Sequence, residues 1–310
     1  MLIDDVYKEY IFEIKIRNYT ERTIKGYKNN LNKFFAYCEN EYGLVEIEEV
    51  THIHIKQYLN LLKSKGLSES YINTILKNIR SFYAYCYEEE YCLNVAKKVS
   101  FLKEKTVLIN TFTDAEVRKM LNVYKMDTYI NARNKCILSI LIDTGIRCSE
   151  LCNIKNIDVK ETVIYIFGKG RKERIISISH YLKKIMIKYE RIRGNYLKDN
   201  QLHYDNYFLS YRNRPLTVEA IDRPLTVEAI ERIVKIAGQK AKVRNEIRCS
   251  PHTLRHYYAQ SQLKNGLDIY SLSRILGHET VDITKRYLQS LKDEQIVEIS
   301  ANTSPLMNLK

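Results

Sequence analysis

The stretch Cys249–Leu288, CSPHTLRHYYAQSQLKNGLDIYSLSRILGHETVDITKRYL, gathers the residues of the chain that are best suited to chemistry on phosphate. It holds His252 and Arg255 in PHTLRH, His278 in LGHE, and Tyr287 nine residues after His278. A guanidinium pairs with two phosphate oxygens, an imidazole moves a proton near neutral pH, and a phenol can be a covalent nucleophile. Singly, each residue could belong to the core or surface of a helical domain. Together they predict a site that acts on a phosphodiester.

Composition narrows the class of protein. The 310 residues are enough for two hydrophobic cores, and the net charge of +13 favours DNA or RNA as partner over a membrane. No apolar run approaches the ~18 residues of a membrane span, and the N-terminus MLIDDVYKEY is acidic where a signal peptide is basic. The seven cysteines form no C-x-x-C pair, which favours reduced thiols over a zinc site. We therefore expect a cytoplasmic protein that binds nucleic acid and holds no metal.

Residues 1–95 show apolar stripes at helical spacing and predict a bundle of four helices. Thr20 is a predicted N-cap, and Gly66 stands where a helix end favours a left-handed residue. Lysines and arginines cover the other faces, Lys77 and Arg80 among them. Such a face can be merely solvated, or it can contact phosphates. We predict that residues 1–95 form a DNA-binding domain.

Residues 96–110 carry four lysines without a clear period and predict a basic linker to a second domain, residues 111–310. That domain begins with a capping box, Thr113 to Glu116. An apolar helix is predicted over residues 131–142.

Arg147 lies at the predicted first turn of the next helix, and Glu150 lies three residues on, on the same face. This spacing can hold a guanidinium toward a phosphate, although a surface ion pair would have the same spacing. The pattern then changes to alternating and β-branched residues, which predict three antiparallel strands over 154–159, 162–167 and 173–179. The turn GKGRK places three cations at a hairpin tip suited to a nucleic-acid groove: Lys169, Arg171 and Lys172.

One internal repeat precedes the opening stretch. RPLTVEAID at residues 214–222 is followed directly by RPLTVEAIE at residues 223–231. Pro224 prevents one helix from running through both copies. We predict that the second copy begins the helix and that the first forms a loop or a single turn.

Four motifs, TGIRCSEL, GKGRKER, PHTLRH and LGHETVDITKRY, resemble the tyrosine recombinase (phage integrase) family in order and approximate spacing. The chain is most similar to the compact two-domain Xer-type enzymes and the integrases of mobile elements. The resemblance implies a mainly α fold. It consists of an N-terminal helical core-binding domain and a C-terminal mixed α/β catalytic domain with a small three-stranded antiparallel sheet.

The resemblance also implies a role for each matched residue. Arg147 and Arg255 match the two catalytic arginines of the family, and Lys169 matches its hairpin lysine. His252 matches the histidine of H-x-x-R, and His278 matches the position that is His or Trp. Glu150 matches the supporting acidic residue, and Tyr287 matches the nucleophile. Lys169 is then the expected general acid for the leaving 5′ oxygen. His252 is the expected proton acceptor from Tyr287, and His278 is an expected hydrogen-bond donor to the phosphate.

The implied activity is site-specific recombination through a 3′-phosphotyrosyl intermediate, without a cofactor. The implied partners are double-stranded DNA with a specific core site and three further copies of the chain in a tetramer, with accessory proteins possible. Two alternatives stay open. One is a catalytically inactive DNA-binding or architectural protein, and the other is a topoisomerase that uses the same tyrosine chemistry. The target sequence and the biological task, whether integration, excision, inversion or dimer resolution, do not follow from the residues.

Overall fold

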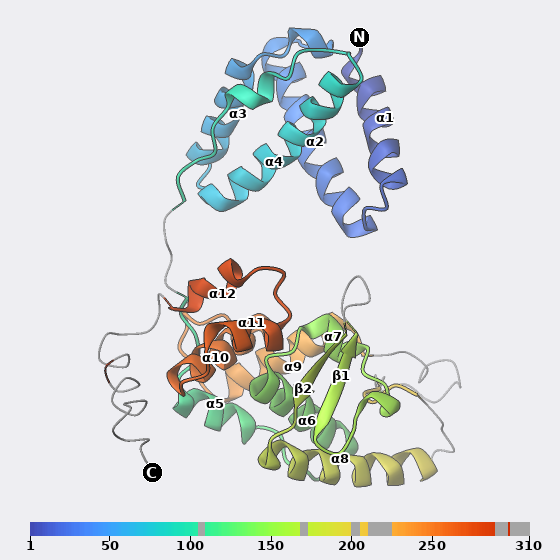
Figure 1. Cartoon of the computed structure of the whole chain (residues 1–310), viewed down its shortest axis with the longest axis vertical. Coiled ribbons are helices and arrows are strands. Elements are labelled where there is room, and N and C mark those ends of the chain that lie inside the picture. Colours follow the sequence, from blue (N-terminus) through green and yellow to red (C-terminus); the bar gives the residue numbers. More distant parts are fainter. Residues whose placement is uncertain (105–108, 168–172, 200–204, 210–224, 289–296, 298–310) are drawn as a thin grey trace. The chain divides into compact units, whose positions relative to one another are not determined.

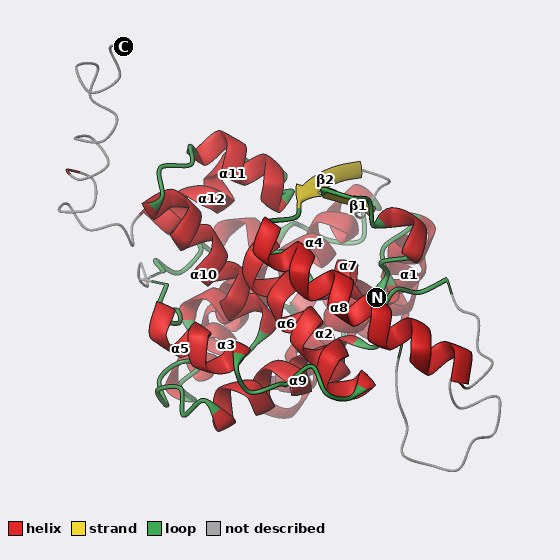
Figure 2. Ribbon diagram, turned by 90° about the horizontal axis from the view of Figure 1, so that it is seen from below, coloured by secondary structure: helices red, strands yellow, loops and turns green. Residues whose placement is uncertain are grey.

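The computed structural model describes residues 1–104, 109–167, 173–199, 205–209, 225–288 and 297. The chain divides into two compact units, Met1–Val107 and Leu108–Lys310. Helices dominate both units, and the strands that the structure describes lie in the second (Figure 1, Figure 2). Among the helices described, none combines the length and the apolar character that crossing a membrane requires.

The N-terminal unit contains the predicted helices. They are α1 (Ile3–Ile16), α2 (Glu21–Tyr42), α3 (His52–Ser64) and α4 (Glu69–Glu88), with 3-10 turns η1 (Ile47–Glu49) and η2 (Val95–Lys98). Thr20 caps α2 as predicted, because its hydroxyl accepts the backbone N–H of Thr23 at 3.3 Å. Gly66 follows α3 with φ of 77°, a left-handed conformation that glycine adopts without strain.

Aromatic side chains fill the core of this unit. Phe34 of α2 and Phe82 and Tyr83 of α4 are fully buried, and Tyr10 of α1 meets Phe82 edge to face at 5.4 Å between ring centroids. Asn73 of α4 is buried as well. Its side chain accepts the backbone N–H of Leu102 at 2.8 Å and donates to the Leu102 carbonyl at 2.9 Å. This pair fixes the chain that leaves η2 against α4.

The second unit is built around one buried helix. Its elements are α5 (Asp114–Leu121), α6 (Tyr129–Thr144), α7 (Cys148–Cys152), η3 (Asn156–Asp158), β1 (Val163–Phe167), β2 (Glu173–Ser177), α8 (His180–Asp199), α9 (Val227–Lys240), α10 (Pro251–Lys264), α11 (Ile269–Leu276) and α12 (Val281–Leu288). α6 is buried around most of its circumference and packs against α5, α8, α9 and α10. The predicted capping box is present at α5, where Thr113 and Glu116 exchange hydrogen bonds.

The prediction of a three-stranded sheet was wrong in one strand. In the described residues β1 and β2 form a two-stranded antiparallel sheet, with Val163 opposite Ser177 and Phe167 opposite Glu173. The first predicted strand, residues 154–159, contains the 3-10 turn η3 instead. The Asp158 carboxylate accepts the Lys155 backbone N–H at 2.8 Å and turns the chain, so only isolated bridges remain on either side.

The second copy of the repeat starts α9, as predicted. Thr226 is the N-cap, and its hydroxyl accepts the backbone N–H of Ala229 at 3.3 Å. Leu225, one residue earlier, is buried in the core of the unit. The first copy, residues 214–222, lies outside the described residues.

Candidate active site

The helix α10 carries the first part of the site. The Ser250 hydroxyl caps it by accepting the backbone N–H of Thr253 at 3.2 Å, and Pro251 occupies the first turn. His252, Arg255 and His256 follow at the spacing of one helical face. α10 therefore presents two imidazoles and a guanidinium together.

Arg255 is held at both ends of its guanidinium. It is 5% exposed and donates to the carbonyls of Gly145 and Leu276, at 2.6 Å each. Burial, and next the charge of Arg147, lower its pKa to about 10. Gly145 ends α6 with φ of 59°, and a Cβ at this position would overlap the ring of Tyr258. Only glycine places this carbonyl at the guanidinium.

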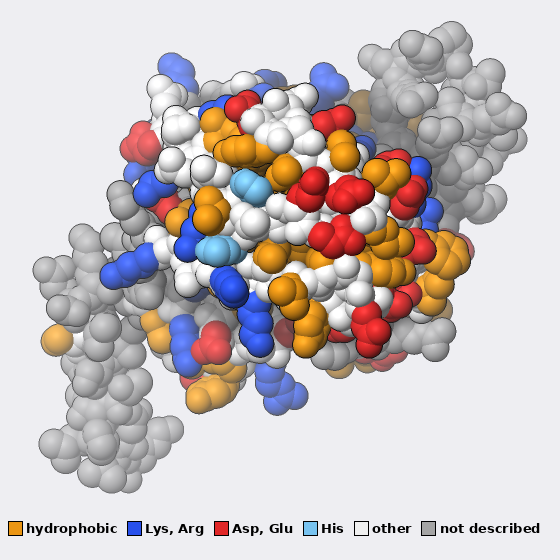
Figure 3. Space-filling model, turned by 90° about the horizontal axis from the view of Figure 1, so that it is seen from above, with side chains coloured by type: hydrophobic (Ala, Val, Ile, Leu, Met, Phe, Trp, Pro, Cys, Tyr) orange, Lys and Arg blue, Asp and Glu red, His pale blue; other side chains and the backbone are white. Residues whose placement is uncertain are grey.

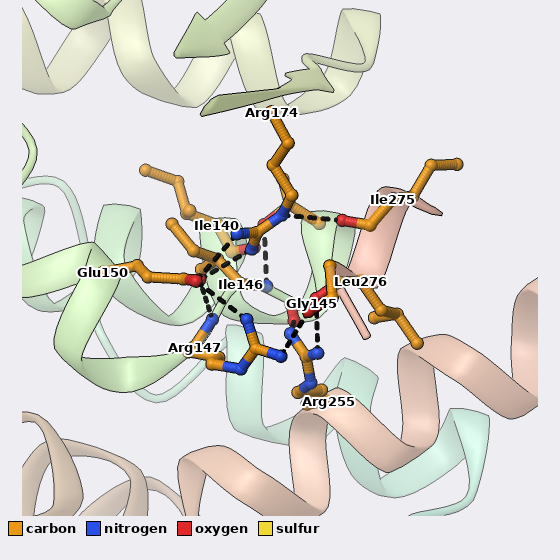
Figure 4. Close-up of polar contacts among 11 residues, drawn as sticks. Ile140, Gly145, Ile146, Arg147, Glu150, Arg174, Arg255, Ile275 and Leu276 are labelled. Carbon is orange, nitrogen blue, oxygen red and sulfur yellow. Dashed lines mark hydrogen bonds and ion pairs between the residues drawn. The ribbon is translucent and has the colours of Figure 1, made fainter. Parts of the chain in front are cut away.

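Arg147, Glu150 and Arg174 form a network beside Arg255 (Figure 4). Arg147, the N-cap residue of α7, donates to Glu150 Oε1 at 3.0 Å and to the carbonyl of Gly277 at 2.6 Å. Arg174 of β2 donates to both carboxylate oxygens of Glu150, at 2.7 and 2.6 Å. The carboxylate thus fixes both guanidiniums with charge-assisted bonds.

Glu150 stays ionised in this setting. Burial alone would raise its pKa, but the hydrogen bonds and charge of Arg174, together with bonds from Arg147, lower the pKa below its usual value. Glu150 and Arg174 have side chains 7% and 12% exposed, whereas that of Arg147 is 41% exposed. The buried pair is therefore the support, and of the two arginines bound to Glu150 it is Arg147 whose guanidinium a ligand can reach.

His278 follows the glycine that ends α11. Its Nδ1 lies 2.7 Å from the hydroxyl of Thr284, a buried residue of α12. Burial, and next the charges of Arg255 and Arg147, lower its pKa to about 4. The ring is neutral near neutral pH. When Thr284 donates to Nδ1, the proton on Nε2 is left for another acceptor.

Tyr287 of α12 is 4% exposed, and its hydroxyl lies 2.9 Å from Nδ1 of His256. Burial raises the pKa of this phenol, while the charge of Arg255 acts in the opposite direction. The rings of His252 and His256 meet edge to face with centroids 4.1 Å apart. Burial and Arg255 also lower the pKa of His252.

These side chains surround one cavity of about 510 Å³. Five predicted site residues line it: Arg147, His252, Arg255, His278 and Tyr287. Glu150 lines an adjoining hollow of about 1110 Å³, which shares Arg147 and His278 and adds Arg174 and Arg274. The arrangement can hold a phosphate between guanidiniums while a phenol stands beside it.

Two residues of the site were missed by the sequence reasoning. His256 is the last residue of PHTLRH, and its place four residues after His252 was the signal that it shares their face. Arg174 lies two residues before the buried Ile176 on β2 and therefore on the same face of the strand, so a charged residue faces the protein interior there. A charge at such a position signals a buried partner, here Glu150.

The other predicted residues lie outside the described residues or in the N-terminal unit. Lys169, Arg171 and Lys172 lie outside the described residues. In the N-terminal unit, Lys77 is exposed on α4. Arg80 donates to the carbonyls of Ala96 and Lys97 at 3.3 and 3.2 Å, and its guanidinium lies 4.7 Å from the ring centroid of Phe101.

The surface charge is uneven. On the face drawn in Figure 3, acidic side chains gather near the middle, and lysine and arginine side chains lie mostly around the rim. The net charge of +13 is therefore not spread as one uniform positive surface over this face.

Comparison with known proteins adds independent information. The Phage integrase family pattern matches residues 110–294, and the pattern described as Phage integrase, N-terminal SAM-like domain, matches residues 6–93. Tyrosine recombinase XerC of Thermodesulfovibrio yellowstonii is 31% identical over 290 residues, which cover 93% of this chain and 91% of that protein. Tyrosine recombinase XerD of Staphylococcus haemolyticus is 28% identical, covering 94% and 96% of the two chains.

Solved structures share the fold. The recombinase XerH bound to palindromic difH substrate, in a post-cleavage complex, gives a TM-score of 0.72 at 20% identity, covering 93% of this chain and 81% of that one. A lambda integrase dimer bound to a COC′ core site gives 0.69 at 18% identity, covering 91% and 97%. With both of its parts matched and a relative at 31% identity along nearly its whole length, this chain belongs to the phage integrase family.

Proposed function

We propose that this chain is a tyrosine-type site-specific DNA recombinase, which cuts and rejoins DNA through a 3′-phosphotyrosyl intermediate. The observation that carries the proposal is the shared cavity of about 510 Å³, in which Tyr287 stands with Arg147 and Arg255. The family relatives named tyrosine recombinase XerC and XerD support it.

The chemistry follows from these groups. The Tyr287 oxygen attacks the phosphorus, the bond to the 5′ oxygen breaks, and the phosphodiester energy is kept in the new ester. Arg147 and Arg255 hold the non-bridging oxygens, where negative charge develops in the transition state. The Nε2 proton of His278 adds a further hydrogen bond to them. Lys169 protonates the leaving 5′ oxygen, and a histidine of α10 takes the tyrosine proton. The cycle needs neither cofactor nor ATP.

DNA is the proposed partner. The two adjoining hollows join at Arg147 and His278, and Arg174 and Arg274 extend the cationic lining beyond the cavity. In this proposal residues 1–95 bind the core site, residues 96–110 link the domains, and residues 111–310 cut the strand. Lys77 and Arg80, with Arg171 and Lys172 of the hairpin, add phosphate contacts. Because such contacts release counterions, binding should weaken steeply with salt.

We propose further that four copies assemble on the DNA. A lambda integrase tetramer bound to a Holliday junction shares the fold, with a TM-score of 0.69 at 14% identity. The tail that follows α12 carries apolar residues at partial helical spacing, and most of it lies outside the described residues. Truncation after Lys292 should leave binding to a single site intact and reduce the pairing of two sites. Gel-shift assays with one and two sites measure this, and unchanged pairing would reject exchange of the tail between copies.

The test of the function uses a binding site selected from random duplex DNA by gel shift. Nicked duplexes built on that site release a short fragment after cleavage, so the covalent adduct accumulates. The native chain should form an adduct that resists detergent, and Tyr287→Phe should form none while binding with nearly unchanged affinity. Tyr270→Phe, at an exposed position on α11, is the matched control and should cleave normally.

The alternatives give different results. Binding by the native chain without an adduct would identify a DNA-binding protein that has lost catalysis. Relaxation of supercoiled plasmids that lack the selected site would identify a topoisomerase. An adduct that persists in Tyr287→Phe would reject Tyr287 as the nucleophile.

A further inference from the structure

We propose that His256, and not His252, takes the proton from Tyr287 when the tyrosine attacks the phosphate. The inference rests on the proposed function and adds to it a catalytic residue, because His256 touches the reacting oxygen. Its basis is the contact of 2.9 Å between the tyrosine hydroxyl and Nδ1 of the imidazole.

The contact has the geometry of a proton transfer. A distance of 2.9 Å is within hydrogen-bond reach, and the two side chains come from different helices, α10 and α12, that pack against each other. The ring centroids are 5.4 Å apart at an interplanar angle of 60°, so the rings do not stack and the hydroxyl approaches the edge of the imidazole. Both residues line the cavity that would hold the phosphate.

The protonation states agree with this direction of transfer. Burial is the main cause that lowers the pKa of His256 to about 4, and the nearby His252, Arg286, Arg255 and His278 add to it. The imidazole is therefore neutral near neutral pH. With the phenol hydroxyl donating to Nδ1, the imidazole proton lies on Nε2.

A bound phosphodiester changes the balance in the cavity. Its negative charge offsets the two arginines on α10 and α12, Arg255 and Arg286, and so raises the pKa of His256 toward neutrality. The base thus gains proton affinity when the substrate is in place. In the transfer, the O–H bond of Tyr287 breaks, the O–P bond forms, the bond to the 5′ oxygen breaks, and the proton stays on Nδ1.

The same histidine serves the reverse step. When a 5′ hydroxyl attacks the phosphotyrosine, its proton returns to Lys169 and the departing Tyr287 oxygen takes back the proton from Nδ1, which restores the starting state. In this proposal His252 is a positioning residue for His256. Its ring lies edge to face with that of His256 at 4.1 Å between centroids and helps to fix the orientation of the base.

The test compares single-turnover rates of covalent adduct formation on the nicked duplex. His256→Asn keeps an oxygen near the position of Nδ1 but cannot accept a proton. We expect the adduct rate to fall by about 10²–10⁴-fold, which is the rate factor that a general base usually contributes. The affinity for DNA should not change. His180→Asn, at the exposed first residue of α8, is the control for the same substitution and should cleave at the native rate.

A second variant separates proton transfer from mere positioning. With 3,5-difluorotyrosine at position 287 the phenol is more acidic and needs less help from a base. The substitution should restore much of the rate lost in His256→Asn, and it should not restore the rate lost in Arg147→Ala. A thermal unfolding scan of each variant confirms that the fold is kept.

Each other result decides against the assignment. A native rate in His256→Asn, or a loss that the fluorinated tyrosine leaves unchanged, would overturn the role of His256. If His252→Asn lowered the adduct rate more than His256→Asn did, and if 3,5-difluorotyrosine rescued only His252→Asn, then His252 would be the base. Failure of the native chain to form any adduct would reject the proposed function and, with it, this inference.

Discussion

Replacement of the buried carboxylate Glu150 by glutamine should destabilise the second unit strongly. The carboxylate accepts two bonds from Arg174, at 2.7 and 2.6 Å, one from the Arg147 side chain at 3.0 Å, and one from the Arg147 backbone N–H at 2.9 Å. Glutamine has nearly the same shape but no charge. The substitution therefore leaves two neighbouring guanidiniums without their counterion.

The magnitude follows from burial. Removing one partner of a buried ion pair costs about 3–5 kcal/mol, and the pair of Glu150 with Arg174 is nearly buried. The pair with Arg147, whose side chain is 41% exposed, adds less than about 1 kcal/mol because solvent screens it. The remaining amide oxygen of glutamine can still accept two of the four bonds, so we take the lower end, about 3 kcal/mol. In a unit of this size that loss lowers the melting temperature by about 6–12 °C.

Differential scanning calorimetry of the full chain measures the effect, because the transition of the N-terminal unit serves as an internal reference. Glu173→Gln, at the neighbouring exposed position on β2, is the matched control and should change stability by less than about 0.5 kcal/mol. The adduct rate of Glu150→Gln should fall as well, since Arg147 loses its anchor. A melting temperature within about 2 °C of the native value would refute the reasoning, because it would mean that the charge of Glu150 does not stabilise the buried guanidinium of Arg174.

Three further predictions concern other parts of the chain. A substrate with a 5′-bridging sulfur should rescue adduct formation in Lys169→Ala but not in Arg147→Ala, because a thiolate leaves without a proton; equal rescue of both would contradict the two roles. Deletion of residues 214–222 should keep the melting temperature and cleavage, because Thr226 caps α9 from the second copy; a large loss of either would show that the first copy is needed. Glu116, whose pKa is lowered to about 2 by Arg244, stabilises the fold above its unfolded pKa of about 4.3, and this contribution is lost as pH falls toward 2. Melting temperatures of the native chain and Glu116→Gln should therefore converge across that window, and a constant difference would contradict the linkage.

Local signals predicted much of the fold. Thr20, Thr113 and Thr226 cap helices where the sequence placed helix starts, because a capping hydroxyl acts on backbone groups two or three residues away. The segment 154–159 failed for the converse reason. Its β-branched residues favour a strand, but the Asp158 carboxylate bonds the backbone of Lys155 and turns the chain.

The site was predictable only in part. Motif order and spacing pointed to Arg147, Arg255 and Tyr287, which line one cavity in the structure. The partner of each group depends on contacts between residues far apart in the chain, such as the bond from Arg174 to Glu150 and that between Tyr287 and His256. No local pattern encodes such pairings, because they arise only when β2, α7, α10 and α12 pack.

The end of α11 has a mechanical consequence. Arg255 and Arg147 donate to two successive carbonyls there, those of Leu276 and Gly277. If the nucleophile swung out by moving α11, both charge-assisted bonds would break, at about 1.5–3 kcal/mol each. A hinge between His278 and α12, at Glu279 and Thr280, avoids that loss and would let α12 move with Tyr287, at the cost of the 2.7 Å contact between His278 and Thr284. Arg147 and Arg255 would then keep their positions while Tyr287 moves, so the site could bind a DNA phosphate before the tyrosine reaches it.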